Sequence, residues 1–172
     1  YNDYSMAHEG KCQGVSEMIR TLIDGGVRVD AIGMQGHMTM TFPTIENFEK
    51  SILAFSNLGV KVMITEMEIS VLPFPSGTVT ADVATSFEYQ QSINPYAIAL
   101  PDSVYQQLQA RYLDFFKLFV QHSDKIDRVT LWGLSDSDSW KNDFPVKGRT
   151  DYPLLFDRAL QPKSVVKELL DL

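Results

Sequence analysis

The sequence places two glutamates, Glu66 and Glu68, at the end of an apolar run that begins at Val60. The β-branched residues of this run are typical of a strand that is buried on both faces. Charged side chains are rarely buried without partners, so the glutamates need either solvent or a polar pocket. Carboxyl groups at the C-terminal ends of barrel strands serve as nucleophiles or as general acids and bases. Glu66 is therefore a candidate catalytic residue, with a solvated strand end as the alternative.

Polar and aromatic side chains also follow other strand-like runs. Gln35 and His37 come directly after the run 27–34. Trp132 lies at the end of a later run, and Trp140 lies in the polar segment that follows it. Taken singly, a structural histidine, a buried amide or a core tryptophan would explain each of these residues. Their arrangement at successive strand ends favours a functional site.

Amphipathic helices are predicted where apolar residues recur at helical spacing. The first helix ends at Gly25-Gly26, and Thr44 is the expected N-cap of the second. Asp102 is the expected N-cap of the third, and Pro162 is expected at the start of the last. The apolar faces comprise Val15, Met18, Ile19, Leu22 and Ile23; Ile45, Phe48, Ile52 and Phe55; Val104, Leu108, Tyr112, Phe115 and Phe119; and Val165, Val166, Leu169 and Leu170.

The predicted strands alternate with these helices. A strand end at Tyr1–Tyr4 is followed by strands over 27–34, 60–70 and 128–133. This alternation predicts an α/β fold with parallel strands. A doubly wound sheet also alternates, but no glycine-rich phosphate loop opens the first helix. A complete TIM (β/α)8 barrel needs about 250 residues, so four β/α units predict a partial barrel, about half of one.

The segment from Ser70 to Pro101 contains no convincing helix or strand. Connections of this length are usually functional or mobile. Because the segment is rich in proline and aromatic residues, we expect an ordered rim loop over the site. An insertion that packs only on itself is the alternative.

Composition excludes several classes of partner. A net charge of −7 and a pI near 4.9 argue against binding to nucleic acid or to an anionic membrane surface. No run approaches the roughly 20 apolar residues of a membrane span. Cys12 is the only cysteine and cannot form an internal disulfide. No signal peptide is visible, and the chain opens within a strand-like pattern at Tyr1. A neutral polysaccharide is compatible with this charge.

Six motifs occur in order along nearly the whole chain. They are Tyr1–Tyr4, Gly33–His37, Ile64–Ile69, Leu131–Asp136, Ser139-Trp140 and Tyr152–Asp157. Together they resemble the C-terminal half of glycoside hydrolase family 10, the retaining endo-β-1,4-xylanases. The region 94–102 resembles xylanases from gut Bacteroidetes.

The resemblance implies that residues 1–172 form the last four β/α units of a family barrel, which hydrolyses internal bonds of xylan. Glu66 falls on the position of the nucleophile, and His37 on the histidine that hydrogen-bonds it. Glu68 stands where the family usually has an aspartate that supports this histidine, so its longer side chain must alter the geometry. Gln35 falls on the glutamine that contacts the sugar at the cleaved bond.

The remaining site residues that the resemblance implies bind sugar. Trp132 and Trp140 fall on tryptophans that line the glycone subsites. Asn2 and Tyr4 match a rim segment near the aglycone side. The substrate would be xylan or a xylo-oligosaccharide, and no metal or organic cofactor is required. The family also implies a secreted, periplasmic or cell-surface location.

The acid/base glutamate of the family, in an Asn-Glu motif on the fourth strand, has no counterpart here. Glu68 faces the same side of its strand as Glu66. However, catalytic carboxyls flank the cleaved bond, roughly 5–5.5 Å apart for retention, so Glu68 is rejected as the acid. Asp136 and Asp138 are other candidates, and they are expected to be solvated loop acids rather than a cation site.

We therefore expect an N-terminal half of the barrel to supply the acid. A half barrel exposes strand edges and an apolar face, which predicts association with that half or with a second copy of this chain. A catalytically incomplete half that self-associates or only binds xylan is the alternative function. The same enzyme acting on another β-glycan, such as β-glucan, is a further alternative.

Overall fold

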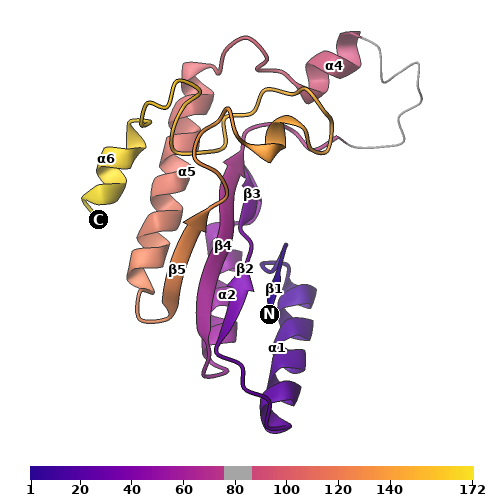
Figure 1. The fold of residues 1–172 in the computed structure, drawn as a ribbon, viewed down its shortest axis with the longest axis vertical. Coiled ribbons are helices and arrows are strands. Elements are labelled where there is room, and N and C mark those ends of the chain that lie inside the picture. The colour runs from indigo at the N-terminus through magenta and orange to yellow at the C-terminus, as the bar shows by residue number, and fades with distance from the viewer. Residues whose placement is uncertain (76–86) are drawn as a thin grey trace.

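A computed structural model provides the structure of the protein and describes residues 1–75 and 87–172 (Figure 1). The strands are β1 (Asn2–Asp3), β2 (Ala31–Met34), β3 (His37–Thr39), β4 (Lys61–Ser70) and β5 (Ile126–Leu131). The helices are α1 (Glu9–Asp24), α2 (Ile45–Ser56), α4 (Phe87–Ile93), α5 (Asp102–Gln121) and α6 (Val165–Leu170), with a 3-10 helix η1 (Trp140–Asn142). The part of the predicted rim loop over 76–86 lies outside the described residues.

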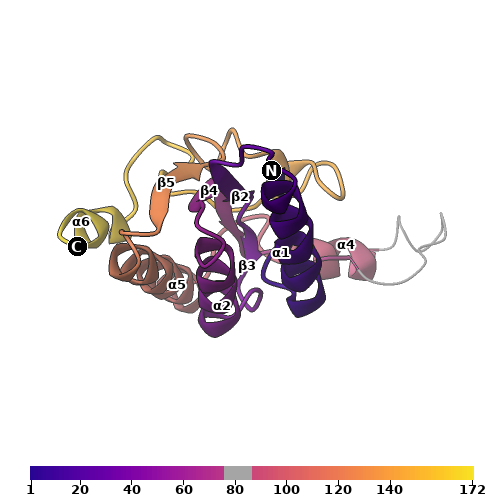
Figure 2. The ribbon, with the colours of Figure 1, turned by 90° about the horizontal axis from the view of Figure 1, so that it is seen from below.

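The strands form one parallel sheet with β4 at its centre. β1 pairs with β2, both β2 and β3 pair with β4, and β5 also pairs with β4. Helices α1, α2 and α5 lie together on one side of this sheet (Figure 2). The segment after β5 passes over the C-terminal end of β4 (Figure 1). The predicted α/β fold, a partial barrel of alternating units, is confirmed.

The core lies between the sheet and the helices. β4 contributes Val62 and Ile64, which are fully buried, as expected for a strand covered on both faces. Phe48 of α2 packs edge-to-face on Phe115 of α5, with ring centroids 5.4 Å apart. Each such buried side chain stabilises the fold by about 1.5–3 kcal/mol. This core fixes the position of β4, the strand that carries both candidate glutamates.

Helix starts were predicted with mixed success. Thr44 caps α2 as predicted, because its side chain accepts a hydrogen bond from the backbone N–H of Asn47 at 3.1 Å. The prediction for α5 was wrong: Pro101 is the N-cap, and Asp102 is the first helical residue. There the charge of Asp102 still suits the positive end of the helix dipole. The start at Pro162 was also wrong, since this proline pairs with Phe156 in an isolated bridge and α6 begins at Val165.

Strand boundaries were also less accurate than strand positions. β2 covers only the last four residues of the predicted strand 27–34, and β5 begins two residues before the predicted strand 128–133. β3 was not predicted. The expectation that 70–101 lacks a helix was wrong, because α4 lies within it. Within the described residues, no helix has the length and apolar character needed to cross a membrane.

Candidate active site

A local irregularity between β2 and β3 brings the candidate residues together. Met34 pairs with Ile64, whereas His37 pairs with Glu68, so β4 has one extra residue across this junction. Gly36 has a φ of +83°, the left-handed region that favours glycine, and a Cβ there would lie 3.0 Å from Ile64. Such bulges re-aim side chains. Here the bulge places His37 opposite Glu68, in the C-terminal part of β4.

Glu66 is held on both carboxylate oxygens. Asn2 donates from Nδ2 to Oε1 at 3.2 Å, and His37 Nε2 lies 3.3 Å from Oε2. Asn2 is itself oriented by Thr65, whose hydroxyl donates to Oδ1 at 2.7 Å. The Glu66 side chain remains 16% exposed. Its carboxylate is therefore fixed in direction and still accessible from solvent.

Glu68 lies on the other side of the same imidazole and is fully buried. His37 Nδ1 lies 2.7 Å from its Oε1. Trp140 donates from Nε1 to both oxygens, at 3.0 and 2.9 Å. An ionised Glu68 can only accept, so His37 carries a proton on Nδ1 in this arrangement. The longer side chain of glutamate therefore reaches His37, and the two glutamates bracket one histidine.

Two residues that sequence analysis missed complete this cluster. Phe144 stacks on Trp140, with ring centroids 4.7 Å apart. The ammonium of Lys141 lies 4.4 Å from the centroid of the Trp140 ring and 3.6 Å from Glu68 Oε1. Burial lowers the pKa of Lys141, while the nearby carboxylates of Glu68 and Asp151 oppose that shift. Lys141 could have been identified from the sequence by its position directly after Trp140, a candidate sugar-binding residue.

The structure leaves three predicted site residues outside this polar cluster. Gln35 contributes its backbone, which donates to Asp3 O at 3.0 Å and accepts from Glu66 N at 2.7 Å. Trp132 follows β5 and is 45% exposed, and Tyr4 is 60% exposed beneath the ammonium of Lys11. Among the described residues, no polar contact joins these three side chains to Glu66.

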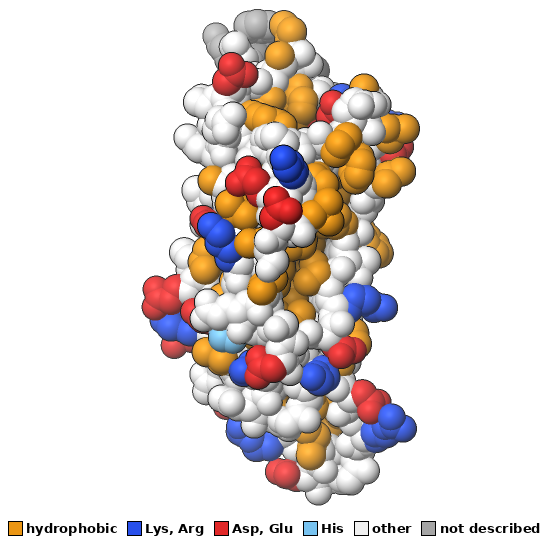
Figure 3. Space-filling view, turned by 90° about the vertical axis from the view of Figure 1, so that its left-hand side faces the viewer, with side chains coloured by type: hydrophobic (Ala, Val, Ile, Leu, Met, Phe, Trp, Pro, Cys, Tyr) orange, Lys and Arg blue, Asp and Glu red, His pale blue; other side chains and the backbone are white. Residues whose placement is uncertain are grey.

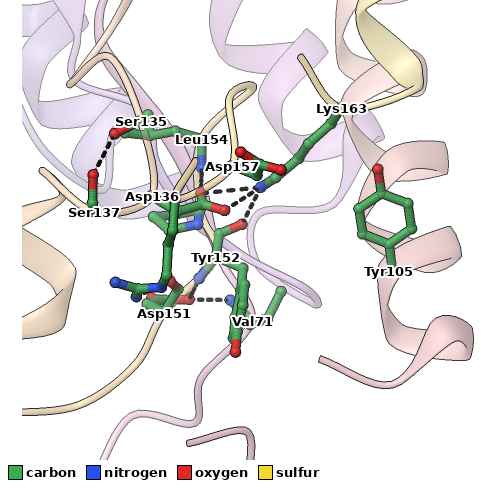
Figure 4. A network of polar contacts seen from close by, with 12 residues as sticks. Val71, Tyr105, Ser135, Asp136, Ser137, Asp151, Tyr152, Leu154, Asp157 and Lys163 are labelled. Atoms are coloured by element: carbon green, nitrogen blue, oxygen red, sulfur yellow. Dashed lines mark hydrogen bonds and ion pairs between the residues drawn. The ribbon is translucent and has the colours of Figure 1, made fainter. Parts of the chain in front are cut away.

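Asp136 contradicts the expectation of a solvated loop acid. It is fully buried, and Lys163 Nζ lies 3.0 Å from both of its carboxylate oxygens (Figure 4). Leu154 N donates to Oδ1 at 2.9 Å. Burial raises the pKa of Asp136 and lowers that of Lys163. Asp138 is exposed as expected. Within residues 1–75 and 87–172, no group of three or more His, Cys, Asp or Glu is placed to hold a metal ion.

The same network ties the segment after β5 to the end of β4. Asn142 donates to the backbone oxygen of Asp136 at 2.9 Å, and its own Oδ1 accepts from Asp151 N at 3.0 Å. The buried carboxylate of Asp151 accepts from the backbone N–H of Val71 at 3.1 Å and from the hydroxyl of Ser70. Trp140 and Lys141 therefore sit on a loop that is anchored next to Glu68.

Comparison of the sequence with known families gives one match over the whole chain. Residues 1–172 match the model of glycosyl hydrolase family 10. Endo-1,4-beta-xylanase A of Xylanibacter ruminicola is 41% identical over 172 residues, which is 100% of this chain and 47% of that protein. Endo-1,4-beta-xylanase A of Caldicellulosiruptor saccharolyticus is 34% identical over 99% of this chain and 45% of its own length.

Solved structures agree with this match. A GH10 endoxylanase retrieved from a sugarcane soil metagenome has a TM-score of 0.88 and 40% identity, over 99% of this chain and 48% of that chain. A mutant solved in complex with xylotriose has a TM-score of 0.84 and 30% identity, over 100% of this chain and 48% of that chain. The chain thus spans about half the length of the relatives that it matches.

Proposed function

Because the chain belongs to glycosyl hydrolase family 10, we propose that it supplies the nucleophile, Glu66, for retaining hydrolysis of internal β-1,4-xylosidic bonds in xylan. The observation that carries this proposal is the setting of the Glu66 carboxylate. Asn2 and His37 hold its two oxygens, while the side chain stays open to solvent at the C-terminal rim of the sheet. A nucleophile needs both properties, a fixed direction and access to substrate.

In this mechanism, the ionised carboxylate of Glu66 attacks the anomeric carbon while the glycosidic bond breaks, and the leaving oxygen takes a proton from the acid/base carboxyl. Water, which gives a proton to the same acid/base group, then hydrolyses the covalent glycosyl-enzyme. His37 orients the nucleophile through Nε2, and Glu68 fixes the ring of His37 through Nδ1. Because these contacts hold the carboxylate of Glu66 in one direction, little ordering is needed during the reaction. No step uses a metal or an organic cofactor.

The acid/base carboxyl is proposed to come from outside residues 1–172. Glu68 is fully buried, and its oxygens are occupied by His37 and Trp140, so it cannot reach a sugar. Retaining enzymes place the two carboxyls on either side of the cleaved bond, about 5–5.5 Å apart. The relatives are about twice as long as this chain, which supports a second half as the source of the acid.

Exposed aromatic side chains support a sugar-binding surface beside Glu66. Trp132 is 45% exposed and Phe144 is 44% exposed, on the segment that also carries Trp140. Aromatic faces bind the C–H faces of sugar rings. We propose xylan rather than another β-glycan because the matched relatives are described as xylanases. Since xylan is an extracellular polymer, we also propose a secreted, periplasmic or cell-surface location.

The partner that we propose is the other half of the barrel, bound at the β5 edge. On this side of the molecule, hydrophobic side chains gather in a band that polar groups flank (Figure 3). A hollow of about 270 Å³ there is lined by α5 and β5, including Phe116, Phe119, Val120 and Val129. Within the described residues, β5 pairs only with β4, so its second edge is available to another strand. A second copy of this chain is the competing occupant.

The proposed function is tested with two substrates that differ in their need for an acid. A dinitrophenyl xylobioside has a leaving group that departs without protonation, whereas xylan requires the acid. We expect the chain to release dinitrophenolate, and to release sugar from xylan only when the missing half is added. Glu66→Gln should abolish both activities. Undiminished release by Glu66→Gln would refute the assignment of the nucleophile.

A second candidate function is xylan binding without catalysis, which the exposed Trp132 and Phe144 favour. In that case, the chain would sediment with insoluble xylan but release neither dinitrophenolate nor sugar, with or without the missing half. The same comparison with β-glucan in place of xylan tests which polysaccharide is preferred.

A further inference from the structure

Lys141 is a nearly buried cation at the back of the site. Its side chain is only 14% exposed, and its ammonium lies 3.6 Å from Glu68 Oε1. The ammonium also lies over two aromatic rings, 4.4 Å from the Trp140 centroid and 5.9 Å from that of Phe144. Lysine is rarely buried without a partner. The position of this one beside Glu68 therefore calls for an electrostatic explanation.

We propose that Lys141 is a positioning residue that balances the charge of the array Glu66–His37–Glu68 and thereby sets the pH range in which Glu66 is ionised. The proposal rests on the function proposed above for Glu66. It assigns to Lys141 an effect on the protonation of the array, beyond packing against Trp140.

The charges of the array balance only when Lys141 is included. With Glu68 ionised, His37 Nδ1 donates to it, and Nε2 can also donate to Glu66 only when the ring is an imidazolium. Two carboxylates and one imidazolium carry a net charge of −1, which Lys141 brings to zero. Without Lys141, the array would carry an uncompensated charge in a largely buried site. Uptake of a further proton would then become favourable at a higher pH.

Other charged groups around the array do not replace Lys141. Tyr112 of α5 is fully buried, and burial followed by the Glu68 charge raises its pKa well above the usual value, so it stays neutral. Asp151 faces Lys141 and adds negative charge. Arg149 is nearby, but its guanidinium donates to backbone oxygens of Pro73 and Phe144. Among the described residues, Lys141 is the only lysine or arginine whose side-chain nitrogen lies within 4 Å of a carboxylate oxygen of Glu68.

The test follows the imidazole resonances of His37 by NMR through a pH titration of this chain. Lys141→Met keeps an unbranched apolar side chain of similar length and removes the charged ammonium. We expect the His37 midpoint to move to higher pH by about half a unit or more, since a charge this close acts through an effective dielectric of about 20. Lys141→Arg should restore the wild-type midpoint.

The controls isolate charge from packing. Lys50→Met removes a lysine that is paired with Glu46 on the exposed side of α2, and it should leave the His37 midpoint unchanged. His122, which pairs with Glu49, serves as an internal reference that should not move in Lys141→Met. An unchanged His37 midpoint in folded Lys141→Met would overturn the proposal. If that variant does not fold, Lys141→Gln provides the same comparison.

A second readout uses the assembled enzyme. The acid limb of kcat/KM should move to higher pH in Lys141→Met, and Lys141→Arg should return the limb to its wild-type position. A loss of rate at all pH values without movement of the limb would show a structural role only and overturn the proposal. If Glu66→Gln keeps full activity, the function proposed for Glu66 fails, while the NMR midpoint still tests Lys141 independently.

Discussion

At the scale of single residues, burial gives Glu66 and Glu68 different tasks. Glu66 keeps 16% of its side chain exposed, whereas Glu68 is fully enclosed by His37, Trp140 and Lys141. A buried carboxylate with this many donors is fixed in its rotamer and cannot approach a sugar. It can, however, hold His37 in the orientation that Glu66 requires. We therefore expect the two glutamates to respond differently to substitution.

Glu68→Gln should lower kcat/KM of the assembled enzyme by about 10²-fold, the size of effect that a small misplacement of a catalytic group produces. The amide nitrogen cannot accept the hydrogen bonds that His37 and Trp140 donate, so the ring of His37 would turn. The measurement is the rate on a dinitrophenyl xylobioside, with the exposed Glu46→Gln as the control. A change of less than twofold would contradict a positioning role for Glu68.

Asp151 allows a prediction about pH and stability. Burial raises the pKa of this carboxyl above its usual 3.8, so the folded state binds more protons than the unfolded state just above that pH. The contribution of Asp151 to the free energy of unfolding therefore falls as pH rises from 3.8 through the raised pKa.

Asp151→Asn removes this titration. The free energy of unfolding of the wild type minus that of Asp151→Asn should accordingly be largest below pH 3.8 and should fall as pH rises. Urea denaturation at a series of pH values measures it. A difference that stays constant or grows with pH would show that the buried carboxyl is not destabilised in its ionised form.

At the scale of elements, the segment between β5 and α6 depends on one buried ion pair. Lys163 contacts Asp136 and also donates to the backbone oxygen of Tyr152 at 2.8 Å. Asp136 in turn accepts from Leu154 N. The pair joins two parts of the segment that carries Trp140, so its integrity affects the site as well as the fold.

Lys163→Met should destabilise the protein by about 3–5 kcal/mol, because removal of one partner leaves a buried charge without compensation. The double variant Asp136→Leu with Lys163→Met should recover part of this loss, since it leaves no unpaired charge. Chemical denaturation measures the free energy of unfolding of Lys163→Met, of Asp136→Leu and of the double variant. If the loss in the double variant equals the sum of the losses in the two single variants, the ion pair is not the source of the effect.

Sequence patterns predicted the parts of the site that lie on one element. The period of two along a strand placed Glu66 and Glu68 on one side, and both indeed contact His37. The burial of Asp136 could not be predicted in this way, because its partner Lys163 lies 27 residues further along the chain. The junction at Gly36 was missed for a similar reason, since a bulge depends on the pairing between two strands.

At the scale of the whole molecule, the chain has the fold of its relatives but about half of their length. The face beside α5 and β5 carries hydrophobic side chains, and Val120 is 48% exposed there. Within the described residues, β5 pairs only with β4, and monomeric proteins rarely leave an apolar face uncovered beside an unpaired strand edge.

Val120→Glu should therefore weaken association without unfolding the chain, because the new carboxylate would be buried in the contact. Sedimentation of the chain, alone and mixed with the missing half, measures the effect. Lys117→Glu, which substitutes an exposed residue of the same helix, is the control. Equal association of wild type and Val120→Glu would exclude this face as the contact.

The assignment of Glu66 is tested most directly by covalent trapping. A dinitrophenyl xylobioside with fluorine next to the anomeric carbon forms the glycosyl-enzyme quickly and releases it slowly. Mass spectrometry of the chain after exposure, followed by peptide mapping, identifies the modified residue. We predict one fluorinated xylobiosyl group per chain, attached to Glu66, and no label on Glu66→Gln. A label on any other carboxyl, or equal labelling of Glu66→Gln, would contradict Glu66 as the nucleophile.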